Sequence, residues 1–220
     1  MAGGRGDHAW QSLAAALWEA LRGDAPLPGR ALHGLLRGLA AEPPEAVWHP
    51  TGFLVLTVWR TEEGALRLHL WPEGPRERGT PCWPVHDHVW DLRSQVLCGE
   101  VESRAYEVVD DPRGEAVLYA VGYGDGRRSC MRRSARRVRV RAQAPQRVGA
   151  GERYAVAAGE FHASTVAVGD LAATLAATVD TPRPWPWVVG DGDGPAEVPV
   201  ERPLAEPSRV VPILRRLTER

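Results

Sequence analysis

Residues 84–90 read PVHDHVW, and a further histidine, His162, follows much later in the chain. Successive side chains of a β-strand point to opposite faces, so His86 and His88 would share one face. Neutral imidazole is a common protein ligand of transition metals. With His162 from a distant strand, this pair would form a three-nitrogen set that leaves positions open for water or substrate. We therefore predict a metal site at these three histidines, although the pair alone also suits a polar strand face.

Two motifs around these histidines resemble those of the cupin family. Gly79, the triplet His86-Asp87-His88 and Gly99 resemble the first cupin motif. Residues 151–162, from Gly151 to His162, resemble the second, with Ala157 where the family usually has proline. The resemblance spans roughly residues 50 to 180, and both motifs occur in the family's order. It implies an all-β fold, a cupin-type jelly-roll barrel with the metal inside.

The pattern of apolar runs and turns supports an all-β fold independently. Gly, Pro, Asp and Glu clusters separate short runs rich in β-formers, which is typical of a sandwich or barrel. The predicted strands are 53–59, 65–71, 85–97, 101–109, 116–122, 137–141, 154–158 and 171–179.

The segments that flank the predicted barrel differ from it in composition. Residues 1–44 show two leucine stripes at helical spacing, the first after a potential cap at Asp7 and the second ending before Pro43 and Pro44. Residues 182–220 are rich in proline and glycine, which favours an extended arm, with a short helix near residues 208–219. We therefore predict an N-terminal helical segment over 1–44, a cupin barrel over 45–181 and a C-terminal arm over 182–220.

The predicted ligand set is similar to that of the thiol dioxygenases, a cupin branch that holds iron with three histidines. Leu92 stands where many cupins carry a ligating glutamate, and the neighbouring Asp91 has the parity of the opposite face. The resemblance implies Fe(II), while Zn, Mn or Ni would suit a site without redox chemistry. The sequence is compatible with Asp91 as a further ligand and with Asp91 as a residue that fixes a turn.

Candidate catalytic residues follow partly from the same branch. Arg60 falls where thiol dioxygenases place a carboxylate-binding arginine, and guanidinium pairs with carboxylate in bidentate fashion. Tyr106 and Tyr154 are candidate acid/base or orienting groups, and Ser164 shares the parity of His162. Residues 174–178 read TLAAT and lack the His and Tyr that cysteine-specific members carry there. Cysteine is therefore a doubtful substrate.

Three functions remain open at this point. The first is a non-haem iron oxygenase acting on a small anionic or amino-acid-like substrate with dioxygen. The second is a non-redox isomerase, lyase or hydrolase, in which the metal polarises a carbonyl or water. The third is a ligand-binding cupin with a structural metal. One fold hosts many chemistries, so the fold cannot choose among them.

Composition narrows the other classes of function. The 220-residue chain has a formal net charge of −1, which predicts no strong attraction to nucleic acid or membrane. The arginine-rich stretch 127–141 alternates with apolar residues, as on a solvated sheet face. Lysine is absent, which excludes Schiff-base and P-loop chemistry. No apolar signal segment is recognisable, and three cysteines without paired spacing favour the cytoplasm. Exposed sheet edges would allow a homodimer.

Overall fold

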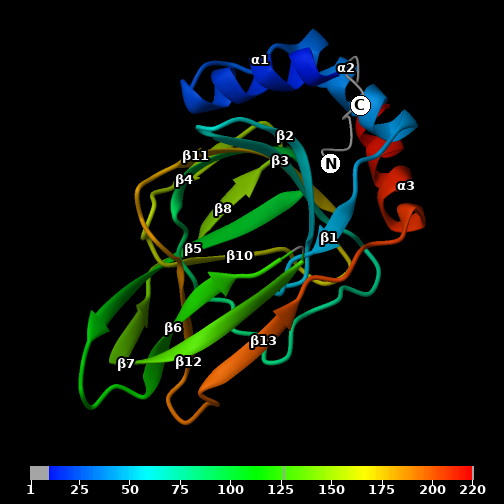
Figure 1. The fold of residues 1–220 in the computed structure, drawn as a ribbon. Helices are drawn as coiled ribbons and strands as arrows, with labels where there is room; N and C mark the ends of the chain where they lie inside the picture. Colours follow the sequence, from blue (N-terminus) through cyan, green and yellow to red (C-terminus); the bar gives the residue numbers. More distant parts are fainter. Residues whose placement is uncertain (1–9, 126, 220) are drawn as a thin grey trace.

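The computed structural model describes residues 10–125 and 127–219, which form three helices and two antiparallel sheets (Figure 1). The helices lie together over one sheet, and both predicted N-terminal helices are present. The predicted cap Asp7 lies outside the described residues. None of the described helices combines the length and the apolar character needed to cross a membrane. The helices are α1 (Gln11–Arg22), α2 (Gly29–Ala41) and α3 (Pro207–Thr218).

The six-stranded sheet lies beneath the helices and has the order β1-β2-β3-β11-β4-β9. Its strands are β1 (Ala46–Trp48), β2 (Leu54–Arg60), β3 (Gly64–Trp71), β4 (Trp90–Cys98), β9 (Arg153–Val156) and β11 (Ala172–Asp180).

The seven-stranded sheet has the order β10-β5-β7-β6-β12, with β8 beside β5 and β13 beside β7. The predicted all-β jelly roll is confirmed, but the two sheets do not close into a single barrel. Its strands are β5 (Glu100–Asp110), β6 (Ala116–Tyr123), β7 (Arg128–Ala142), β8 (Gln146–Gly149), β10 (His162–Thr165), β12 (Trp187–Asp191) and β13 (Glu197–Glu201).

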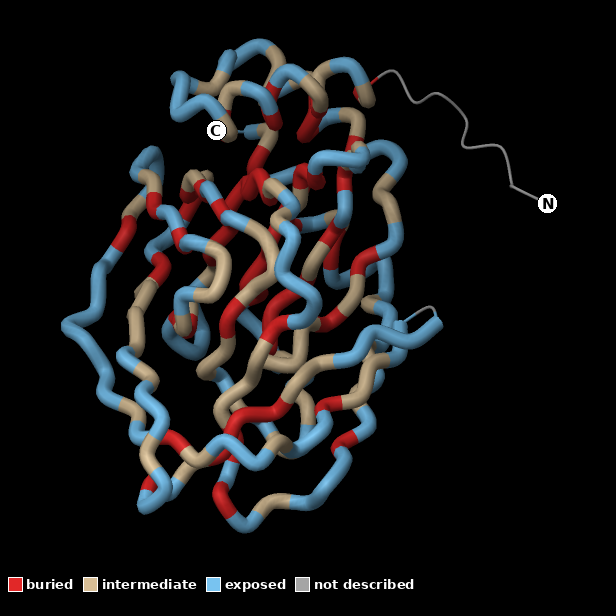
Figure 2. The backbone as a smooth tube through the Cα atoms, turned by 60° about the vertical axis from the view of Figure 1, so that its left-hand side comes forward, coloured by how far each residue is buried: buried red, intermediate tan, exposed pale blue. Residues whose placement is uncertain are grey.

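The main core lies between the helices and the six-stranded sheet. Leu66, Leu68 and Leu70 of β3 point into it, together with leucines of all three helices. The alternate side chains of β3, among them Arg67 and His69, face the second sheet instead. Figure 2 shows buried residues in the strands below the helices and exposed residues in the outer loops. Strand alternation thus divides β3 into a core face and a face toward the space between the sheets.

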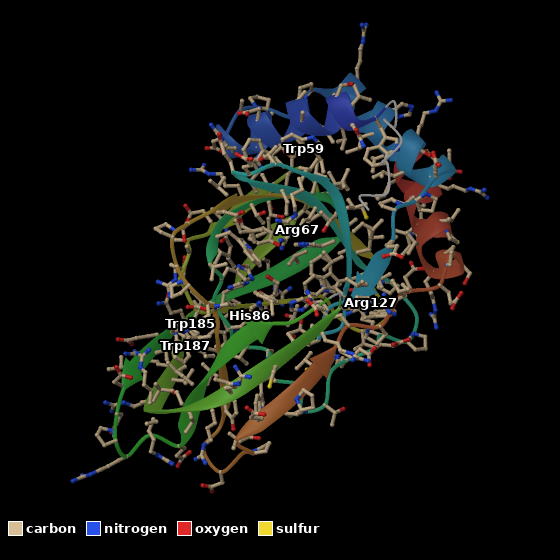
Figure 3. The ribbon with its side chains drawn as sticks, viewed as in Figure 1. Trp59, Arg67, His86, Arg127, Trp185 and Trp187 are labelled. Atoms are coloured by element: carbon tan, nitrogen blue, oxygen red, sulfur yellow. The ribbon has the colours of Figure 1, made fainter. Side chains whose placement is uncertain are left out.

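An irregularity in β2 decides where Arg60 points. The pairing register with β3 shifts between Thr57 and Trp59, so two residues on β2 oppose one on its partner. Val58 and Trp59 therefore both pack toward the helices, and Trp59 lies beside Trp18 of α1 with ring centroids 5.3 Å apart (Figure 3). Arg60 returns to the side of the space between the sheets.

The strand predicted over 85–97 begins only at Trp90, so this boundary was wrong. Residues 85–89 lie outside the regular strands, and His86 makes isolated bridges to His162 and Val188. The segment fills the gap between β10 and β12, the two ends of the second sheet's main path. The alternation of side chains survives, with His86 and His88 on one side and Asp87 on the other.

The C-terminal arm is extended, as predicted, but it contributes two strands that the sequence did not reveal. β12 pairs with β6, and β13 pairs with β7. Beyond β13, the Pro203 carbonyl accepts a hydrogen bond from the Trp48 amide at 2.9 Å. The arm therefore connects the edge of the six-stranded sheet to the other sheet. Helix α3 follows it and contains Pro212 beyond its first turn.

Candidate metal centre

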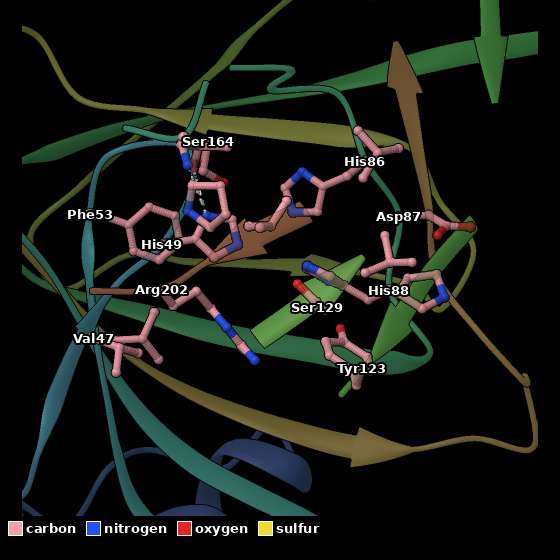
Figure 4. A pocket seen from close by; sticks show the side chains of 18 of the residues that line it. Val47, His49, Phe53, His86, Asp87, His88, Tyr123, Ser129, Ser164 and Arg202 are labelled. Carbon is pink, nitrogen blue, oxygen red and sulfur yellow. Dashed lines mark hydrogen bonds between the residues drawn. The ribbon is translucent and has the colours of Figure 1, made fainter. Parts of the chain in front are cut away.

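A cavity of about 910 Å³ lies between the two sheets. Val55 and Arg67 line it from the six-stranded sheet, Val121 and Ser129 line it from the other sheet, and Arg202 lines it from the C-terminal arm. Figure 4 shows side chains from these separate parts of the chain converging on one space. A concave space of this size with a few polar groups is typical of a small-molecule site.

The three predicted histidines come together in this cavity. His86, His88 and His162 each offer one ring nitrogen, and these nitrogens lie within 4.8 Å of one another. Their ring centroids are 4.7 to 5.0 Å apart. A divalent metal holds imidazole nitrogen at about 2.0–2.1 Å, so modest side-chain rotations would bring all three onto one ion.

Backbone hydrogen bonds on both sides fix the segment that carries His86. The His86 amide donates to the His162 carbonyl at 3.1 Å, and the His162 amide donates to the His86 carbonyl at 2.9 Å. On the other side, the Asp87 amide donates to the Trp187 carbonyl at 2.9 Å, and the Val189 amide donates to the Val85 carbonyl at 2.9 Å. The positions of two histidines therefore depend on β10 and on the C-terminal arm.

Asp87 anchors the same segment from its buried side. Its carboxylate accepts the Trp187 amide at 2.5 Å and an Arg183 nitrogen at 3.1 Å. The side chain is only 1% exposed, and this burial raises its pKa, whereas the two hydrogen-bond donors oppose the rise. Asp87 therefore holds the arm against the histidine segment and is not part of the histidine cluster.

The protonation of the cluster suits a metal. The Pro84 carbonyl can only accept a hydrogen bond, so the His86 Nδ1 atom 2.8 Å away carries a proton and Nε2 has a free lone pair. Burial lowers the pKa of His86 and His88 and, with the repulsion of His86, lowers that of His162 to about 3. All three rings are thus neutral at pH 7, the state in which imidazole binds a metal. The donor set fits a divalent transition metal.

The other predicted residues fall in different places. Arg60 and Tyr154 line the cavity, the first exposed and the second buried with a pKa raised by burial. Tyr106, on β5, is not among the described residues that line it, so its role stays a prediction. Asp91 is exposed and accepts the Ala158 amide at 2.8 Å, fixing a turn outside the cluster.

Aromatic rings extend from the histidines along the cavity wall. Trp90 stacks on His88 with ring centroids 5.1 Å apart, and Phe53 stacks on Trp71 at 4.7 Å. These rings, with Trp83, line the cavity. They give the site an apolar wall beside the potential ligands, which limits the access of water.

Sequence reasoning missed several polar residues in this wall, among them His49, His69, Arg67 and Arg202. His49 stacks on Phe53 at 4.4 Å, and its ring centroid lies 5.5 Å from that of His86. The Thr51 amide donates to His49 Nδ1 at 3.3 Å, so the proton of the neutral His49 ring is on Nε2. Arg67 and His69 lie two residues apart on a predicted strand and therefore share one face. This alternation could have indicated that both side chains line the cavity.

The arginine-rich stretch lies on β7, on the outside of the molecule. Three of its arginines pair with carboxylates that lie on or next to neighbouring strands, at 3.0 to 3.5 Å. These pairs join Arg132 to Glu197, Arg136 to Asp110 and Arg139 to Asp111. The stretch therefore has partners within the protein, and the absence of nucleic-acid binding stays a prediction.

Comparisons with known proteins give only distant likenesses. No family model and no curated protein matches the sequence. A conserved protein of unknown function from Streptococcus pyogenes matches with 16% identity and a TM-score of 0.33, over 61% of this chain and 79% of that one. A structure from work on the DMSP lyases RdDddP and RnDddQII matches with 14% identity and a TM-score of 0.36, over 84% and 77%. Likenesses this weak carry no argument about function, which rests on the site.

Proposed function

We propose that this chain is a metal-dependent cupin enzyme, a non-haem iron oxygenase that acts on an organic anion with dioxygen. The observation that carries the proposal is the cluster of His86, His88 and His162, three neutral imidazoles that converge in a cavity between two sheets. Three neutral ligands leave a divalent ion with its full positive charge, which favours an anionic substrate. When bound, Fe(II) would supply one-electron chemistry and open positions for substrate and dioxygen.

The protein's own groups would orient the substrate and keep the site dry. Trp90 and Phe53 cover the space beside the histidines. Arg60 stands at the end of β2, where its guanidinium can attract a carboxylate from solvent. Tyr154 remains a neutral phenol because burial raises its pKa, so it can donate a hydrogen bond within the cavity.

The resemblance to the thiol dioxygenases does not extend to cysteine as substrate. Residues 174–178 lie on β11 and contain neither imidazole nor phenol. The cavity of about 910 Å³ is also far larger than an amino acid of that size requires. We therefore propose a different acid for this chain.

A non-redox lyase or isomerase is the second candidate, and His49 is the observation that favours it. This neutral imidazole is not one of the three clustered histidines but lies next to His86. Its Nε2 proton and its buried position suit a group that exchanges a proton with a substrate. Zn or Mn at the cluster would then polarise the substrate without redox change.

The metal assignment is tested by replacing one histidine. His86→Ala should lose essentially all bound metal, because two imidazoles and water hold a divalent ion far more weakly than three imidazoles. The measurement is metal content per chain by elemental analysis after purification. His69→Ala is the matched control, since His69 lines the same cavity outside the cluster and should keep full metal. Full metal in His86→Ala would disprove the assignment.

The choice between oxygenase and lyase needs two further readings. Iron in the purified protein and uptake of dioxygen with candidate acids would support the oxygenase. Zinc, with product formed in the absence of dioxygen, would favour the second candidate. Under that outcome His49→Gln should abolish turnover and leave metal content unchanged.

A further inference from the structure

Two arginines in the cavity wall form no side-chain hydrogen bond or ion pair within the described protein. Arg67 comes from β3, and Arg202 directly follows β13. The Nε atom of each is buried, and no hydrogen bond or ion pair joins either guanidinium to another described residue. Each guanidinium lies over an aromatic ring, with Arg67 Cζ 4.4 Å from the centroid of Trp90 and Arg202 Cζ 5.7 Å from that of Tyr123. Buried polar groups normally have a hydrogen-bond partner, so a buried guanidinium nitrogen without one at each arginine indicates a place for an acceptor.

The described acidic residues nearby do not form ion pairs with these two arginines. Burial lowers the pKa of Arg67 to about 10, repulsion from Arg60 adds to the shift, and attraction to Tyr123 and Asp180 only partly opposes it. Asp180 and Glu201 line the same cavity, yet neither forms an ion pair with these arginines. Asp87, on the opposite side of its segment from the histidines, is already paired with Arg183.

The backbone holds Arg202 in place, which distinguishes it from a mobile surface arginine. Its amide donates to the Arg127 carbonyl at 3.1 Å, and the Trp48 amide donates to Pro203 at 2.9 Å. The Ala205 amide donates to Ala46 at 2.8 Å. The residue is therefore tied to both sheets, and Figure 4 shows its guanidinium pointing into the pocket. Arg67 lies within the body of the molecule (Figure 3), and it is one of the residues that line the cavity.

The rest of the wall indicates what kind of anion would fit. Rings of Phe53, Trp71 and Trp90 line the cavity together with Val121 and Val188. The volume of about 910 Å³ is near the upper end for cavities that enclose drug-sized ligands. A small hydrophilic acid would leave most of this apolar surface uncovered.

We propose that Arg67 and Arg202 together bind the carboxylate of a substrate with a bulky apolar body, such as an aryl-substituted alkanoic acid. Guanidinium groups bind carboxylate through paired, charge-assisted hydrogen bonds, and the aromatic wall covers the body. This inference deepens the proposed function and rests on it, since another part of the substrate would face the histidine cluster. Arg60, which is exposed, would attract the acid at the rim and would not hold it.

The test uses the purified full chain and isothermal titration calorimetry. The carboxylate probes are phenylacetate, 3-phenylpropionate and 4-phenylbutyrate. Two comparison compounds are propionate, which lacks the aryl group, and 3-phenyl-1-propanol, which lacks the negative charge. We expect at least one aryl acid to bind more tightly than both comparison compounds. Arg67→Gln and Arg202→Gln should each weaken that acid at least tenfold, because each removes charge-assisted hydrogen bonds, and should leave the binding of the alcohol unchanged.

Arg93→Gln is the matched control. Arg93 is exposed on β4, next to Leu92 but on the opposite face of the strand, so its loss should change nothing. Thermal unfolding of each variant verifies that it is folded. Equal affinity in the arginine variants and the unchanged protein, or no binding of any aryl acid at millimolar concentration, would overturn the proposal.

Metal content, measured on the same samples, separates this inference from the proposed function. Arginine-dependent binding in a protein that takes up no metal would support the acid site and contradict the metal enzyme. Full metal content without arginine-dependent binding would support the metal enzyme and contradict the acid site.

Discussion

The two faces of strand β3 differ in how completely the protein satisfies them. One face is packed against the helices, and the other carries a polar group that lacks a hydrogen-bond partner in the described protein. Leu66, Leu68 and Leu70 are fully buried against the helices. Between them, Arg67 and His69 face the cavity and carry polar groups. The first face is complete with the protein's own side chains. The second keeps a buried guanidinium nitrogen without a hydrogen-bond partner in the described protein, as the proposed binding of an acid at this face would require.

The largest expected effect comes from cutting into the core face. Leu68→Ala removes a fully buried side chain and leaves a hole that the packed sheet cannot close, which should cost about 2–5 kcal/mol of unfolding free energy. Chemical denaturation measures this. Thr57→Ala, on the cavity side of β2, should cost less than about 0.5 kcal/mol. Similar losses in both variants would show that the two faces do not differ as described.

A smaller expected effect concerns the pH dependence of the unfolding free energy, to which His69 on the cavity face contributes. Burial, followed by repulsion from Arg67, lowers the pKa of His69 to about 3, whereas an unfolded histidine has a pKa near 6.5. Below about pH 6.5 the unfolded chain takes up a proton that folded His69 refuses, so stability falls as pH falls toward 3. This group contributes at most about 1.4 kcal/mol per pH unit.

Between pH 6 and pH 5, the unfolding free energy of His69→Gln should therefore fall by about 1 kcal/mol less than that of the unchanged protein. Chemical denaturation at both pH values gives the difference. His33→Gln is the control, because His33 is exposed on α2 and should leave the pH dependence unaltered. A slope that His69→Gln does not reduce would contradict a neutral, buried His69.

Much of the fold followed from alternation and turns in the sequence, because strands with one buried face must alternate. The predicted strand boundary was wrong where a segment pairs with its neighbours through single bridges. The segment around His86 makes only single bridges, and no sequence pattern records that. β12 and β13 escaped because prolines at 186 and 199 hid their alternation. Their pairing depends on where β6 and β7 leave space.

The site divides in the same way. The histidine cluster was predictable because spacing on one strand-like segment and a motif on another carried it. Arg67 could have been found from its parity with Trp71 on β3. Arg202 could not, because its direction is set by hydrogen bonds between the arm and both sheets. Tyr106 was chosen without a parity argument, and it lies on β5 outside the cavity wall.

The smallest effect, and the sharpest test of the cavity face, has the opposite sign to ordinary mutations. Arg67→Met keeps the apolar stem but removes an unpaired charge and its repulsion from Arg60 and Arg202. Loss of the contact with Trp90 offsets about 1 kcal/mol of this gain, and water in the cavity solvates part of the guanidinium. The net result should be a stabilisation of about 0.5–1 kcal/mol by chemical denaturation. Arg93→Met, on the exposed face of β4, should stay within about 0.5 kcal/mol of the unchanged protein. A destabilised Arg67→Met would mean that the guanidinium already has its partner within the protein, and that β3 is complete on both faces.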